Sequence, residues 1–161
     1  MKWDKDNFYI ASVVYDDSFR QMESSSDIWR HDSIQVAIDT LCEKPAKYTG
    51  NVYEYGAALT PEGPAAYCWQ AALSKTNGPK PAEWVNVIRN DQNCTTTYIM
   101  KIPKADVEPM PLAEKHVFGF NIGINDSDVF TREDFIELTP GIIQDDIGKN
   151  PSYFKNFILV K

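Results

Sequence analysis

The stretch IWRHDSIQVAID, residues 28–39, decides the fold class. In its second half, the apolar side chains of Ile34, Val36 and Ile38 occupy every other position, and the residues between them are small or polar. This two-residue period is typical of a β-strand that packs one face against a core. Trp29 precedes the strand among polar neighbours. The stretch therefore predicts a strand with one apolar face, one mostly polar face and an indole ring at its start.

Similar patterns recur along the rest of the chain, separated by breaks that contain glycine and proline. We expect strands at residues 8–15, 33–39, 52–59, 66–73, 84–89, 95–102, 117–125 and 154–160. Residues 18–27 are expected to form a polar loop, and residues 104–114 a connection with one helical turn. Many short strands without a competing helical period favour an all-β fold. We predict one domain over residues 1–161, an antiparallel β-sandwich with a jelly-roll-like, immunoglobulin-like two-sheet architecture.

Composition narrows the classes of partner. The 161 residues carry a formal net charge of −7, and the lysines and arginines are scattered. Because an acidic surface repels phosphate backbones, we expect no nucleic acid partner. No stretch is long and apolar enough for a membrane span, and the sequence runs from Met1 into charged residues without the pattern of a signal peptide. We therefore expect a cytoplasmic protein, or a mature or excised piece of a secreted one.

The three cysteines do not form a recognisable site. Cys42, Cys68 and Cys94 are too widely spaced for a metal knuckle or a redox pair. Their odd number leaves at least one thiol free, and the sequence leaves one disulfide open.

The polar strand face beside the indole suits a carbohydrate. A flat ring offers an apolar surface to the C–H bonds of a pyranose, which suggests Trp29 as a stacking platform. The amide of Gln35 and the carboxylate of Glu54 are groups that make paired hydrogen bonds to adjacent hydroxyls. Alternatives stay open: Trp29 could close the core, Gln35 and Glu54 could lie on a solvated face, and Trp69 or Trp84 could be the platform or pack in the core.

Motifs for catalysis are missing from the sequence. It has no nucleophile elbow, no phosphate-binding loop and no zinc-protease motif. A glycosidase needs two carboxylates across a cleft, and Glu54 with Asp32 or Glu137 could be imagined in that role. Since no spacing enforces such a pair, we do not expect an enzyme.

Several blocks, in order along most of the chain, resemble family 9 carbohydrate-binding modules, which are β-sandwich domains found beside xylanases and in bacterial surface proteins. The blocks are Asp6–Tyr9 leading to Tyr15 and Asp16, Trp29 with Asp32–Asp39, Tyr98–Pro103, Phe118–Asp126, and Asn150–Phe154 followed by Phe157–Val160. The second block is similar to the family pattern Trp-x-x-Asp-Ser-Val-Glu, and the fourth to Gly-Phe-Asn-x-x-Val-Asn-Asp.

The resemblance implies a non-catalytic module that binds a plant or bacterial polysaccharide or oligosaccharide, such as xylan. It also implies a place in a secreted or cell-surface glycoside hydrolase system. Family members often carry structural calcium, and Asp16 matches a position that can serve there. Asp126 and Asp128 end another strand and offer the same type of hard oxygen ligand.

The chain also departs from the family pattern. Sugar-binding members hold the saccharide between two tryptophans; Trp29 matches the first, whereas the second would fall near Gly148, where there is no ring. Gln35 replaces a family glutamate, and a family arginine falls near Glu54. Members usually begin with further N-terminal strands, so we expect an exposed sheet edge through which the chain forms a homo-oligomer. Two alternatives remain: a module that has lost sugar binding and serves protein–protein contact, and a small glycoside hydrolase.

Overall fold

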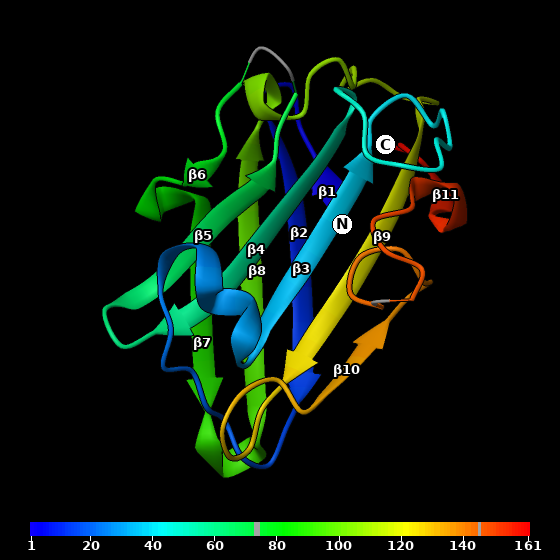
Figure 1. Ribbon diagram of the computed structural model, residues 1–161. Coiled ribbons are helices and arrows are strands. Elements are labelled where there is room, and N and C mark those ends of the chain that lie inside the picture. Colours follow the sequence, from blue (N-terminus) through cyan, green and yellow to red (C-terminus); the bar gives the residue numbers. More distant parts are fainter. Residues whose placement is uncertain (73–74, 145) are drawn as a thin grey trace.

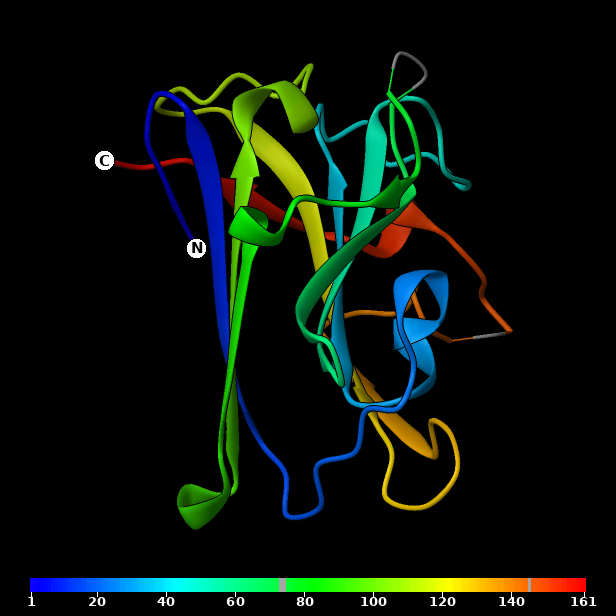
Figure 2. The same cartoon turned by 90° about the vertical axis from the view of Figure 1, so that its left-hand side faces the viewer.

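Two antiparallel sheets pack face to face in the computed structural model, which describes residues 1–72, 75–144 and 146–161 (Figure 1 and Figure 2). The four-stranded sheet has the order β1 (Lys2–Trp3), β2 (Asn7–Tyr15), β8 (Thr95–Pro103), β7 (Val85–Asn90). The seven-stranded sheet has the order β10 (Asp134–Glu137), β9 (Val117–Asp126), β3 (Ser33–Asp39), β4 (Val52–Thr60), β5 (Gly63–Gln70), β6 (Gly78–Pro79), and β11 (Lys155–Ile158) also pairs with β9. This architecture confirms the predicted all-β sandwich.

The core lies between the sheets and is built from the apolar strand faces that the sequence pattern predicts. Ile34, Val36 and Ile38 on β3 have no exposed surface, and Phe118 on β9 is 1% exposed. The rings of Phe8 and Phe118 meet edge to face with centroids 5.6 Å apart, which links β2 to the opposite sheet. Burying a side chain of this size stabilises the fold by about 1.5–3 kcal/mol. The outward faces of the same strands are thereby fixed in position.

Most predicted strands are confirmed, and residues 33–39 match in both bounds. The strand predicted at 66–73 is observed at 63–70, as β5, and residue 73 lies outside the described residues. The short strands β1, β6 and β10 were not predicted, because two to four residues are too few to show a period.

Short 3₁₀ turns connect several strands. The described residues contain η1 (Ser25–Arg30), η2 (Ala82–Trp84), η3 (Asp91–Asn93), η4 (Lys104–Asp106) and η5 (Pro151–Tyr153). The η4 turn confirms the helical turn predicted in residues 104–114, whereas η1 corrects part of the polar loop predicted at 18–27. Ile28 is fully buried, and the Trp69 indole Nε1 donates to the carbonyl of Ser26 at 2.9 Å. These two contacts hold η1 and place Trp29 at the start of β3.

Cys42, Cys68 and Cys94 are free thiols, and burial raises the pKa of Cys68 to about 11. Among the described residues, no helix has the length and apolarity needed to cross a bilayer.

Candidate functional site

A pocket of about 310 Å³ opens on the outer face of the seven-stranded sheet. It is lined by Trp29, Gln35, Glu54, Trp69, Arg132, Ile142, Ile143 and Lys149. These residues come from η1, β3, β4 and β5, and from the segments that precede and follow β10. The structure therefore brings Trp29, Gln35 and Glu54, the three residues selected from the sequence as ligand-binding, into one pocket.

Gln35 and Glu54 form the floor as neighbours on adjacent strands. In the β3–β4 ladder Ala37 lies opposite Glu54 and Gln35 opposite Gly56, so Gln35 and Glu54 share the outward face. The Gln35 Nε2 donates to Glu54 Oε1 at 2.9 Å, and Asn125 Nδ2 on β9 donates to Gln35 Oε1 at 3.2 Å. The floor is thus a row of polar groups across three strands, in which each group orients the next.

Glu54 is the charged group at the centre of this floor, and it is only 1% exposed. Its Oε1 accepts a hydrogen bond from Lys149 Nζ at 2.6 Å. Its Oε2 and the Tyr48 hydroxyl are buried without a hydrogen-bond partner among the described atoms. Burial, and then the charge of Glu54, raise the pKa of Tyr48 well above its usual value, so this hydroxyl stays protonated. The Glu54 carboxylate can therefore accept a further hydrogen bond, either from the neighbouring Tyr48 hydroxyl or from a ligand hydroxyl.

Trp29 forms one wall of the pocket and is half-buried. The guanidinium carbons of Arg30 and Arg132 lie 5.0 and 5.1 Å from its ring centroid. Arg132 also lines the pocket and donates to Asn125 Oδ1 at 3.3 Å. A sugar that stacks on Trp29 must therefore share the indole with Arg132 or displace it, and an exposed cation–π contact of this kind is worth only about 0.5–1 kcal/mol.

Trp69 forms a second wall, which the sequence offered only as an alternative platform. Its ring lies directly over Gly56 on β4, where a Cβ atom would come within 2.3 Å of the ring. Gly56 is the feature of the sequence from which this position of Trp69 could have been predicted, because a strand residue without a side chain leaves room for a ring on the neighbouring strand.

Gly56→Ala is expected to lower the free energy of unfolding by about 1.5 kcal/mol, because the added methyl group overpacks against the Trp69 ring. Urea unfolding followed by tryptophan fluorescence measures the change. The matched background is Trp69→Leu, in which the ring is missing and the same glycine substitution should cost much less. An equal cost in both backgrounds would contradict the close packing of Gly56 and Trp69.

Trp84, the other alternative platform, belongs to the core. It is 7% exposed, its ring centroid lies 6.1 Å from that of Tyr55, and Lys80 Nζ lies 5.3 Å from its centroid. It does not line the pocket.

The segment after β10 covers part of the polar sheet face. The Glu137 carboxylate accepts hydrogen bonds from the backbone N–H groups of residues 142–144, at 2.6–3.3 Å. Ile143 packs against Gly123 on β9, where a Cβ atom would come within 2.3 Å of the isoleucine side chain. Glu137 thus holds this segment against the sheet.

All seven residues of β3 are buried. Those on its outward face are buried because the segment after β10 covers them. Gln35 is 4% exposed, so the alternative of a solvated sheet face for Gln35 and Glu54 is wrong. Both residues line the pocket.

A cluster of carboxylates lies where β2 and β9 end and β3 begins. Single ligand oxygens of Asp16, Asp32 and Asp126 all lie within 4.8 Å of one another. Asp32 is 4% exposed, and its burial, followed by the charges of Asp16 and Asp126, raises its pKa to about 7. The Arg89 guanidinium lies 3.5 Å from Asp16.

The sequence analysis selected only Asp16 of this cluster as a calcium ligand; it noted Asp126 as a carboxylate at a strand end and missed Asp32 as a ligand. Asp32 precedes a strong strand pattern, and only the fold brings it beside two other strand ends. A second set of ligand oxygens, from Asp16, Asp17 and Asp128, meets the same distance limit at a more exposed position. Clustered carboxylate oxygens are the donors that Ca²⁺ prefers.

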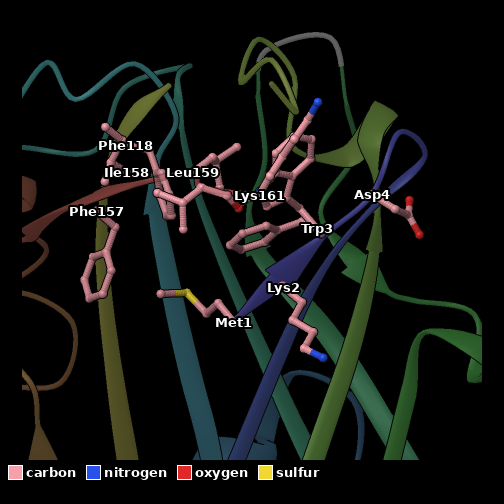
Figure 3. A pocket seen from close by; sticks show the side chains of 11 residues that line it. Met1, Lys2, Trp3, Asp4, Phe118, Phe157, Ile158, Leu159 and Lys161 are labelled. Atoms are coloured by element: carbon pink, nitrogen blue, oxygen red, sulfur yellow. Dashed lines mark hydrogen bonds between the residues drawn. The ribbon is translucent and has the colours of Figure 1, made fainter. Parts of the chain in front are cut away.

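A larger cavity, of about 660 Å³, lies elsewhere, between β1 and the C-terminal segment (Figure 3). Its walls are mainly the apolar side chains of Met1, Trp3, Phe118, Phe157 and Leu159. Because it lacks a row of convergent amide and carboxylate groups, it does not suit a ligand rich in hydroxyls.

Comparisons with known proteins identify the family and support the fold. The family model described as carbohydrate family 9 binding domain-like matches residues 1–161. A family 9 carbohydrate-binding module from Caldicellulosiruptor kristjanssonii in complex with glucose has a TM-score of 0.74 at 16% identity, covering 98% of this chain and 73% of that one. A family 9 module from the same organism in complex with cellotriose gives a TM-score of 0.74 and 16% identity, with 98% and 71% covered. A search of curated proteins finds no match.

Proposed function

The chain belongs to the family 9 carbohydrate-binding domains, and on this premise we propose that it is a non-catalytic module whose saccharide occupies the pocket of Trp29, Gln35 and Glu54. The observation that carries the proposal is the convergence of an accessible indole with a buried amide–carboxylate pair in one hollow. The glucose and cellotriose complexes of the two similar modules support a sugar as the ligand class.

In this proposal the sugar ring lies against Trp29, and its hydroxyls exchange hydrogen bonds with the floor. Glu54 accepts, Gln35 donates or accepts, and Lys149 and Arg132 donate at the rim. A pocket of about 310 Å³ is at the small end of ligand sites. It therefore suits a monosaccharide or the end of a short oligosaccharide.

Isothermal titration with glucose, xylose, cellobiose, cellotriose and xylo-oligosaccharides tests the proposal. We expect saturable heat from at least one of them, and none from sorbitol, a polyol without a ring to stack on the indole. Weak binding is expected, because the sequence has no tryptophan near Gly148, where the family has its second ring, and the pocket's other indole, Trp69, packs over Gly56. Absence of heat from every sugar at millimolar concentration would remove the proposal.

A second candidate is a module that keeps the fold without the sugar. Arg132 lies over the Trp29 ring, and Lys149 bonds to Glu54 inside the pocket, so both polar and aromatic contact groups already have protein partners. The same titrations separate the candidates, since this one predicts no sugar binding by the folded chain.

We further propose that Asp16, Asp32 and Asp126 hold a structural calcium ion. Three carboxylates, one of them buried, fit the hard-oxygen chemistry of this ion, which would neutralise their mutual repulsion. The ion would supply charge compensation and no step of sugar binding, because these residues do not line the pocket.

Calcium at ten times its dissociation constant is expected to stabilise the fold by about 1.4 kcal/mol, and chelation should reverse the effect. For a chain of 161 residues this corresponds to a rise in Tm of about 3–5 °C. Scanning calorimetry with calcium and with a chelator measures the difference. Asp126→Asn should abolish the shift, whereas Asp134→Asn, outside the cluster, should keep it; identical Tm values for the parent with and without calcium would contradict the site.

We also propose that the module serves a secreted or cell-surface system that degrades polysaccharides such as xylan. Retention of the chain on insoluble xylan or cellulose, with no hydrolysis of nitrophenyl glycosides, is the expected outcome. Turnover of such a glycoside would favour the alternative of a small glycoside hydrolase.

A further inference from the structure

Strand β2 is paired along the whole of one edge but along only part of the other. On one side β8 pairs with it from Asn7 to Tyr15. On the other side β1 pairs only with Phe8 and Tyr9. Within the described part of the chain, no strand continues beside residues 10–15 on this side.

The backbone groups on this open edge can be identified from the ladder. The carbonyl of Asn7 accepts from Asp4 on the β1 side, and the N–H of Asp16 donates to Cys94 on the β8 side. Because backbone groups of successive strand residues alternate between the two edges, the N–H and C=O groups of residues 11, 13 and 15 point away from β8. The open edge therefore presents three residues whose donors and acceptors are available for a further strand.

The side chains of the edge do not protect it. Residues 10–15 read Ile-Ala-Ser-Val-Val-Tyr, without a charge or a proline, and the β2–β8 register runs through them without a bulge. Val13 is 56% and Tyr15 81% exposed. Natural sheets usually guard long open edges with lysine, proline or bulges, so an unguarded β-branched edge indicates a partner strand.

The sandwich is also open beside this edge. A cleft of about 320 Å³ separates Val14 of β2 from Ile124 of β9 and Phe135 of β10, and all three side chains are only partly buried. Four carboxylates also line it, those of Asp16, Asp17, Asp126 and Asp134. At the other end of the same side, the apolar cavity of Figure 3 lies between β1 and β11. A strand added to β2 would shield apolar surface at the first cleft.

We propose that the open edge of β2 pairs with the same edge of a second copy of this chain, antiparallel and with Val13 opposite Val13. In this two-fold register residue 11 faces residue 15 of the other copy, so all three outward-pointing residues of each edge find a partner. The two four-stranded sheets become one continuous sheet, and the open edge of β2 is paired in both copies.

The charges at the two ends of the open edge favour a second copy of the chain as the partner. β1 of the other copy already occupies the edge beside Phe8 and Tyr9, with the exposed Lys2 opposite Tyr9, so each chain must leave the shared edge after Tyr15. The backbone bends at Asp17, and this exposed carboxylate then lies near Lys2 of the other copy. The two-fold axis repeats this contact, so two acidic ends meet two basic ends. The sugar pocket lies on the outer face of the other sheet and does not take part, so the dimer is independent of the proposed sugar binding.

Sedimentation velocity over a concentration series tests the inference. The unchanged chain should sediment as a dimer that dissociates on dilution. Val13→Pro removes one edge donor without touching the β8 ladder, and should give a monomer at concentrations where the unchanged chain is dimeric. Val13→Thr keeps the donor and the β-branch, and should remain dimeric.

A second variant covers the case in which the proline variant does not fold. Val13→Lys keeps the backbone donor but places two cations opposite each other on the axis, so it too should be monomeric. Its control is Ile88→Lys, because Ile88 is 53% exposed and belongs to the same cross-strand row through Thr97, at the other edge of the sheet. This control should stay dimeric. A monomeric parent, an open series of larger species, or a Val13→Lys dimer would overturn the proposal.

Discussion

Replacing Trp29 by alanine is expected to weaken sugar binding by about thirtyfold while the chain stays folded. An aromatic contact contributes about 0.5–1.5 kcal/mol beyond the apolar area that it covers, and the two terms together come to about 2 kcal/mol. Trp29 is half-buried in η1, outside the main core cluster, so its loss should leave the sandwich intact. Isothermal titration with the tightest sugar measures the change, and circular dichroism checks the fold.

The matched control is Tyr153→Ala. Tyr153 is 49% exposed and does not line the pocket, so this variant removes an accessible ring of similar size without changing the affinity. If Trp29→Ala binds sugar as tightly as the parent, the indole is not the platform. Arg132→Ala then reports what the neighbouring guanidinium does: a rise in affinity means that it competes for the indole, and a fall means that it donates to the sugar.

The sequence predicted the sandwich well because its core strands alternate strictly. In β3 and β9 the side chains that fill the space between the sheets stand at every second position, and this period needs no knowledge of neighbours. Gln35 and Glu54 were accessible to the same reasoning, since polar residues on the outward faces of strands can be recognised before the strands are paired.

The rest of the pocket depends on contacts that no local pattern encodes. The segment that covers the sheet has irregular backbone, and its position is set by the hydrogen bonds to Glu137 and by the room at Gly123. Trp69 reaches the pocket because Gly56 on the next strand leaves space for its ring. Asp32 joins its cluster only because the fold gathers the ends of three segments. Each of these depends on a pairing between distant residues.

The buried carboxyl group of Asp32 is expected to give the chain a pH-dependent stability that Asp32→Asn removes. Burial, reinforced by the charges of Asp16 and Asp126, raises the pKa of Asp32 from 3.8 to about 7 in the folded state. Between these values the folded chain keeps a proton that the unfolded chain has released, so stability falls as the pH rises, and the whole penalty is present above about pH 7. It amounts to about 4 kcal/mol.

The measurement compares urea unfolding of the parent and of Asp32→Asn from about pH 4 to about pH 8, with a chelator present. The amide cannot accept from both backbone N–H groups that bond to the carboxylate, those of Arg20 and Ser127, so the variant carries a constant cost at every pH. Burial lowers the pKa of His31, which makes stability fall as the pH drops through the same range, but this effect is common to both chains and cancels in their difference. Relative to the parent, the variant should therefore gain about 4 kcal/mol across the range. If the free energies of unfolding of the two chains change with pH in parallel, Asp32 has the same pKa in the folded and the unfolded chain. The repulsion among the three carboxylates would then be too weak for a bound cation to stabilise the fold by relieving it.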